Sequence, residues 1–113
     1  MTKRTVHILG SKWMINFRSR AEDKNLNNAD GYCDWTVRGI VIEKEMNGNL
    51  INMERYINKV IRHEIVHAFP LESGLAECSS EADCWAQNEE MVDWIARMGP
   101  DIYAAWREAE ALD

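Results

Sequence analysis

The sequence predicts an α+β domain, in which a small antiparallel sheet of three to four strands packs on the helices that follow it in the chain. Apolar residues alternate with polar ones over much of residues 5–43, as in half-buried strands, and recur at helical spacing after Asn52. A chain of 113 residues can close one core but not two. We therefore expect one domain over residues 1–113.

The first two strands form a predicted hairpin. Thr5–Leu9 is rich in residues that favour strands, and Gly10-Ser11 indicates a turn. Lys12–Arg18 carries Trp13, Ile15 and Phe17 in alternation. This pattern predicts a second strand with one apolar face.

A second hairpin is predicted after a polar loop over Ala21–Asp30. Its strands are Tyr32–Trp35 and Gly39–Glu43, and its turn covers Thr36–Arg38. The second of these strands contains three consecutive β-branched residues, which favour extended structure.

Three helices are predicted in the second half of the chain. Asn52 is a good N-cap for the first, which we expect Pro70 to end. Ser80 begins a second helix that runs to about Met98, where Gly99-Pro100 should break it. A short C-terminal helix follows from Asp101 to about Leu112.

The composition excludes several classes of protein. A net charge of −6 and a pI near 5.0 argue against a surface that coats nucleic acid. No apolar run approaches the length of a membrane span, and the N-terminus lacks the core of a signal peptide. Three cysteines without an export signal suit a reducing cytoplasm, in a bacterial host or a phage-infected cell.

The motif His63-Glu64-Ile65-Val66-His67 reads H-E-x-x-H and lies within the first predicted helix. Residues four apart share one face of a helix, so His63 and His67 can hold the same metal ion. Glu64 can then take a proton from a metal-bound water. The pattern predicts a hydrolytic site with one Zn²⁺ ion, a metal that needs a third protein ligand and one open position.

The segment Asn88-Glu89-Glu90-Met91-Val92-Asp93 resembles the N-E-x-x-x-D pattern of gluzincin metallopeptidases. This resemblance implies that Glu89 is the third zinc ligand and that Asp93 and Asn88 support the ligands. Helical spacing agrees, because Trp85, Glu89, Val92 and Ala96 fall on one apolar face. Asp93, one turn after Glu89, is placed to accept an N–H from a zinc-bound imidazole. Glu90 is the alternative ligand.

The resemblance extends over residues 30–97. Gly31-Tyr32-Cys33-Asp34, Gly39-Ile40-Val41-Ile42 and Glu72-Ser73-Gly74-Leu75 flank the two helical motifs, and the whole is similar to small phage and prophage zinc-peptidase-like proteins of the minimal-gluzincin type. It implies a zincin-like fold and a peptide or protein substrate. Pro70 departs from the pattern, since a helix-compatible residue there would let the motif helix continue.

The expected reaction is hydrolysis of a peptide bond, with Glu64 as the general base. Peptidases of this class usually add a donor for the tetrahedral oxyanion. The candidates are His7, Tyr103, Tyr56 and Tyr32, among which spacing does not choose.

Two other functions compete with this interpretation. In the first, the zinc ion only ties two helices together, and the protein acts by binding a host or phage partner. In the second, the protein is a regulatory peptidase that cleaves a repressor. Glu64 favours an enzyme, because a purely structural zinc site needs no base.

Overall fold

The computed structural model describes residues 4–45, 50–74 and 89–113. It confirms the α+β class. The elements follow one another as β1 (Arg4–Ile8), β2 (Ser11–Arg18), the 3-10 helix η1 (Lys24–Leu26), β3 (Gly31–Asp34), β4 (Gly39–Glu43), α1 (Met53–Ser73) and α3 (Glu89–Glu108).

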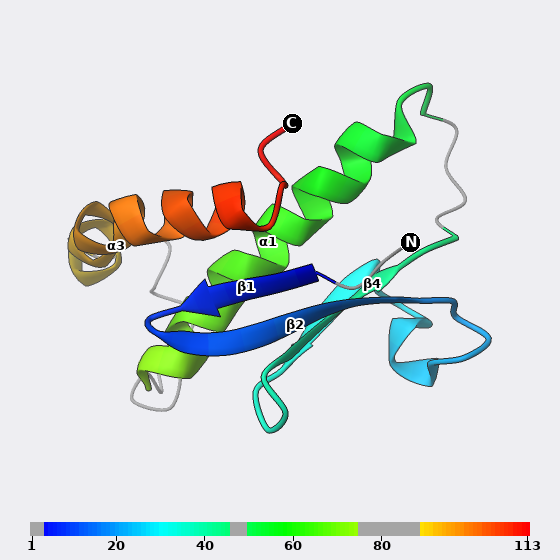
Figure 1. Cartoon of the computed structure of the whole chain (residues 1–113), viewed down its shortest axis with the longest axis horizontal. Helices are drawn as coiled ribbons and strands as arrows, with labels where there is room; N and C mark the ends of the chain where they lie inside the picture. The colour runs from blue at the N-terminus through cyan, green and yellow to red at the C-terminus, as the bar shows by residue number, and fades with distance from the viewer. Residues whose placement is uncertain (1–3, 46–49, 75–88) are drawn as a thin grey trace.

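The four strands form a mixed sheet with the order β1-β2-β4-β3. The β1–β2 and β3–β4 pairs are antiparallel as predicted, but β2 and β4 run parallel, so the expectation of a fully antiparallel sheet is wrong. The reason is the path of the chain after β2 (Figure 1). It reaches the far edge of the sheet first, and the β3–β4 hairpin then returns β4 beside β2 in the same direction.

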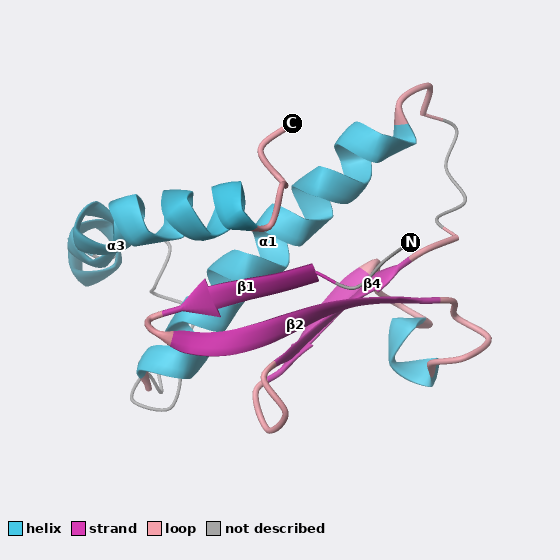
Figure 2. Ribbon diagram, in the orientation of Figure 1, coloured by secondary structure: helices cyan, strands magenta, loops and turns pink. Residues whose placement is uncertain are grey.

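One face of the sheet packs on α1 and α3, and this contact is the core of the protein (Figure 2). Alternation along the strands directs a set of fully buried side chains to this face: Val6, Ile8, Trp13, Ile15, Ile40 and Ile42. Helix α1 meets them with Ile57, Ile61, Ile65, Ala68 and Phe69. The helix that carries the H-E-x-x-H motif is therefore fixed over the sheet by its apolar stripe.

The loop between β2 and β3 contacts the sheet through Tyr32 of β3 and Glu43 of β4. Tyr32, whose neighbours in β3 point toward α1, donates a hydrogen bond from its hydroxyl to Asp23 in this loop. The guanidinium of Arg20 donates to the backbone oxygen of Leu26 over 2.7 Å, and the Leu26 side chain is fully buried. These contacts hold the segment that leads into β3.

Helix α1 begins as predicted and ends later than predicted. The Asn52 side chain accepts a hydrogen bond from the backbone N–H of Arg55, as an N-cap does. Pro70 lies inside the helix, which continues to Ser73 and stops at Gly74, in the left-handed conformation. The expected end at Pro70 is therefore wrong. A proline removes one hydrogen bond of the helix, whereas burial of Phe69 favours continuation.

Helix α3 also corrects a prediction. Instead of a break at Gly99-Pro100 and a separate C-terminal helix to Leu112, one helix runs through this pair to Glu108. Figure 1 shows that its axis changes direction between the gold and the orange parts, which is how a helix accommodates an internal proline. The predicted start of that helix at Ser80 lies outside the described residues.

Glu72, in the last turn of α1, connects the helix to the sheet. It accepts a hydrogen bond from the indole N–H of Trp13 over 2.9 Å, and it forms an ion pair with Arg38 over 2.6 Å. Arg38, and to a smaller extent Trp13, lower the pKa of the Glu72 carboxyl below its ordinary value. The end of α1 beyond His67 is thereby tied to β2 and to the β3–β4 turn.

Among the described helices, none combines the length and the apolar character that crossing a membrane requires.

Candidate metal site

His63 and His67 lie one turn apart on the exposed side of α1, and their rings converge. The two Nε2 atoms are 3.1 Å apart, with the ring centroids 4.8 Å apart and the ring planes at 67°. Two imidazole ligands at 2.0–2.1 Å from a tetrahedral zinc ion would place their nitrogens about 3.3 Å apart. The separation of the two nitrogens is therefore close to that of two ligands of one zinc ion.

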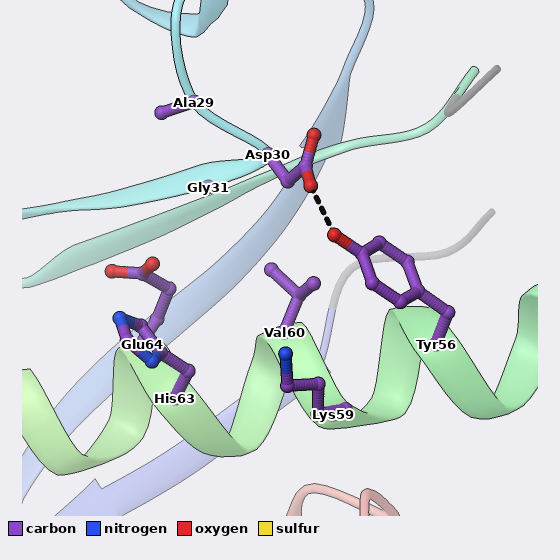
Figure 3. A pocket seen from close by; sticks show the side chains of 8 residues that line it. All are labelled: Ala29, Asp30, Gly31, Tyr56, Lys59, Val60, His63 and Glu64. Carbon is purple, nitrogen blue, oxygen red and sulfur yellow. Dashed lines mark hydrogen bonds between the residues drawn. The ribbon is translucent and has the colours of Figure 1, made fainter. Parts of the chain in front are cut away.

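Glu64 faces the sheet instead of the solvent. It follows His63 by about 100° around the helix, and it is only 6% exposed. Figure 3 shows its carboxylate directed toward the strand that starts at Gly31. A base in this position is screened from bulk water on its sheet side, while His63 and His67 remain accessible.

Two residues of β3 contact Glu64. At Gly31 an added Cβ would lie 3.2 Å from the Cγ atom of Glu64, so the backbone of β3 passes directly beside this side chain. The Cys33 sulfur lies 3.1 Å from the backbone oxygen of Glu64 and 3.6 Å from Oε1. Both positions share one face of β3, because they are two residues apart.

The Cys33 thiol is a hydrogen-bond donor to Glu64. Burial raises the pKa of the Cys33 thiol strongly, and the negative charge of Glu64 raises it further. The thiol therefore stays protonated at neutral pH. The protonated thiol can therefore donate to Glu64.

The Gly31→Val substitution is expected to destabilise the protein by about 1–3 kcal/mol, the usual effect of overpacking a filled site. A side chain at this position would meet the backbone oxygen of Val41 at 3.0 Å and Ile42 Cδ1 at 3.2 Å, as well as Glu64. Urea unfolding of parent and variant measures the change.

Gly39 offers the matched control, since it lies at the other end of the same hairpin. An added Cβ there meets only Val37 Cγ2 at 3.4 Å, an ordinary contact distance. Gly39→Val should cost less than Gly31→Val. Equal losses at the two positions would show that the close approach of β3 to Glu64 has no energetic consequence.

Two pockets open on either side of Glu64 and share Gly31, His63 and Glu64. We call the first the His67 pocket. It measures about 430 Å³, and its other lining residues are Tyr32, Cys33, His67, Pro70 and Leu71. We call the second the Tyr56 pocket (Figure 3). It measures about 260 Å³, and its other lining residues are Ala29, Asp30, Tyr56, Lys59 and Val60.

Strand β3 is an edge of the sheet, and within the described residues no strand pairs with its outer side. The backbone oxygen of Asp30 accepts a hydrogen bond from the backbone N–H of Glu43, the last residue of β4, over 2.9 Å. Hydrogen-bonding alternates along an antiparallel pair, so the backbone groups of Gly31 and Cys33 point outward, away from β4. An extended peptide could pair with them beside Glu64.

The four candidate oxyanion donors occupy different places. His7 lies on β1, at the other edge of the sheet, where it is 54% exposed and paired with Glu108 at 3.2 Å. Tyr103 lies on α3 and is 52% exposed. Tyr56 and Tyr32 instead line the two pockets beside Glu64. Both have a raised pKa, with the Asp30 carboxylate as the main cause at Tyr56 and burial as the main cause at Tyr32.

The predicted third ligand is not placed relative to the histidines. Glu89 and Glu90 are the first two residues of α3, but their side chains and that of Asp93 are outside the described part, as is all of Asn88. Among the described side chains, no three His, Cys, Asp or Glu residues form a group that could hold a metal ion. Glu89, with Glu90 as the alternative, stays a prediction.

Comparison with known proteins adds no relative: no protein-family model, curated protein or solved structure matches this chain.

The sequence predicted site roles for His63, Glu64 and His67. It assigned no role to Lys59, and it did not indicate that Gly31 and Cys33 contact Glu64. One signal was present. A glycine at the start of a short strand often marks a close approach of another group to the backbone, and Cys33 lies two residues later on the same face.

Proposed function

We propose that this protein is a zinc-dependent peptidase that cleaves extended peptide segments, with Glu64 as its general base. The observation that carries the proposal is the pair of converging imidazole nitrogens, 3.1 Å apart, with a buried carboxylate beside them at an open sheet edge. A purely structural metal site could also use the two imidazoles as ligands, but it has no need of a buried glutamate next to them.

Each residue has a defined task in this reaction. His63 and His67, together with the predicted ligand Glu89, would hold the metal. Bound zinc would make a water molecule more acidic and polarise the carbonyl of the substrate. Glu64 accepts a proton from the attacking water and delivers it to the nitrogen of the departing amine. The Cys33 thiol, which lies against the backbone oxygen and Oε1 of Glu64, helps to position this residue.

The substrate binds as an additional strand in this proposal. The outward backbone groups of Gly31 and Cys33 form hydrogen bonds with an extended chain, whose side chains then reach the pockets on either side of Glu64. The odd cysteine count, with Cys33 as a free thiol, supports a cytoplasmic location.

Metal analysis combined with peptide cleavage tests the proposal. We expect one equivalent of zinc in the purified protein, cleavage of internally quenched peptides, loss of cleavage with a chelator, and recovery after zinc is added back. Zinc binding without cleavage of any peptide would favour the alternative of a zinc-stabilised binding module. Cleavage that survives complete removal of metal would contradict a metallopeptidase.

A further inference from the structure

Lys59 places a cation in the Tyr56 pocket, one helical turn before His63. Its exposed side chain lines this pocket together with Val60, Asp30 and Glu64 (Figure 3). The ammonium also lies over the ring of Tyr56, 5.6 Å from its centroid. A contact with an aromatic face leaves N–H donors of the ammonium available for an anion.

Two carboxylates line the pocket with Lys59, those of Asp30 and Glu64, and the first is already paired. Asp30 pairs with Arg20 over 3.1 Å and accepts a hydrogen bond from the Tyr56 hydroxyl over 2.5 Å. Within the described residues Lys59 forms no ion pair. The Tyr56 pocket therefore contains a cation whose charge the described part of the protein does not neutralise by direct contact.

We propose that Lys59 binds a carboxylate of the substrate, and so gives the Tyr56 pocket a preference for an acidic group on its side of the scissile bond. This inference rests on the peptidase function proposed above. The carboxylate belongs either to an Asp or Glu side chain or to the free C-terminus of a peptide. On a chain with a net charge of −6, such a ligand is disfavoured over most of the surface, so a local cation should have a measurable effect.

Peptide binding to a Glu64→Gln background tests this preference without cleavage. The probes are fluorescent, otherwise uncharged ten-residue peptides, blocked at both ends, with Glu, Gln or Lys at one central position. A fourth probe has the central Gln and a free C-terminal carboxylate. We expect zinc-loaded protein to bind the Glu peptide about threefold to fivefold more tightly than the Gln peptide at low salt, as for an exposed ion pair.

Substitutions at Lys59 should remove or keep this difference according to charge. Lys59→Ala should bind the Glu and Gln peptides equally, and Lys59→Arg should retain the preference. Lys12→Ala is the control, because Lys12 is an exposed lysine on β2 that lines neither the Tyr56 pocket nor the His67 pocket. Raising the salt concentration to about 0.5 M should reduce the preference, because it screens exposed charges.

The outcomes separate this inference from the proposed function. If Lys59→Ala weakens binding of the peptide with the free C-terminal carboxylate but not of the Glu peptide, the group that Lys59 recognises is the chain terminus. Equal binding of all probes to parent and Lys59→Ala would overturn the inference, even if the protein cleaves peptides. Failure of the peptidase function would instead appear as an absence of turnover while Lys59-dependent binding persists. If none of the probes binds, the inference is overturned, and the cleavage assay decides the peptidase function separately.

Discussion

The Glu64→Gln variant is expected to bind zinc as the parent protein does and to hydrolyse peptides about 10²–10⁴-fold more slowly, the usual contribution of a general base. The amide has nearly the same size as the carboxylate and still offers an oxygen to the Cys33 thiol. It cannot accept the proton of the attacking water. The substitution therefore removes the proton transfer while the packing of α1 against β3 is kept.

Metal content, the urea midpoint and the cleavage rate should be measured together on this variant. Glu54→Gln is the matched control, because Glu54 is an exposed glutamate on the same helix and lies outside both pockets. It should change the cleavage rate little. Parent-like turnover in Glu64→Gln would show that Glu64 is not the base, and loss of zinc in the same variant would point to a structural effect on the site.

The local features of this fold could be predicted from the sequence because their causes are local. Alternation of Trp13 and Ile15 identified β2, and the side chain of Asn52 caps α1 as expected. The parallel pairing of β2 with β4 could not be predicted in this way. It depends on the path of the chain across the sheet. The alternation of apolar and polar residues within a strand does not indicate which strand lies beside it.

The two errors in the helices have one physical cause. Pro70 and Pro100 each remove a hydrogen bond from a helix, and from sequence each is expected to end it. Tertiary packing overrides this local preference, since Phe69 and Ile102 are buried beside these prolines. The change in direction of α3 in Figure 1 shows that the signal at Gly99-Pro100 was real, although it produces a bend and not a break.

The candidate metal site also has local features that could be predicted and non-local ones that could not. His63 and His67 could be predicted because their separation of four residues is a property of one helix. The contacts of Gly31 and Cys33 with Glu64 join segments about 30 residues apart in the sequence, and only the fold brings them together. The position of Lys59 one turn before His63 also follows from helical spacing. Its proposed role, however, depends on the ion pair between Asp30 and Arg20, which only the fold shows.

The third ligand can be identified with a pair of adjacent substitutions on α3. We expect Glu89→Ala to weaken zinc binding by more than about 100-fold and Glu90→Ala to change it little. Even residues that only support metal ligands account for 10–100-fold in affinity, so loss of a ligand should exceed that range. Competition with a chromophoric chelator measures the affinity.

Geometry makes this comparison decisive. Adjacent residues of a helix are separated by about 100°, so a single point on α1 can be reached by only one of the two carboxylates. The predicted pattern favours Glu89, which is one turn before Asp93. Position 90 instead precedes Trp94 and Met98 by four and eight residues, and both of these side chains pack against the core.

The two variants therefore distinguish Glu89, which the sequence motif favours as the ligand, from Glu90, which the spacing to Trp94 and Met98 favours. Loss of zinc in Glu90→Ala alone would move the ligand by one residue and leave the peptidase proposal intact. Parent-like affinity in both variants, with His63→Ala and His67→Ala each losing the metal, would place the third ligand outside α3's first turn. A hydrolytic zinc ion needs three protein ligands and one open position for water. Another segment of the chain would then have to supply the third ligand.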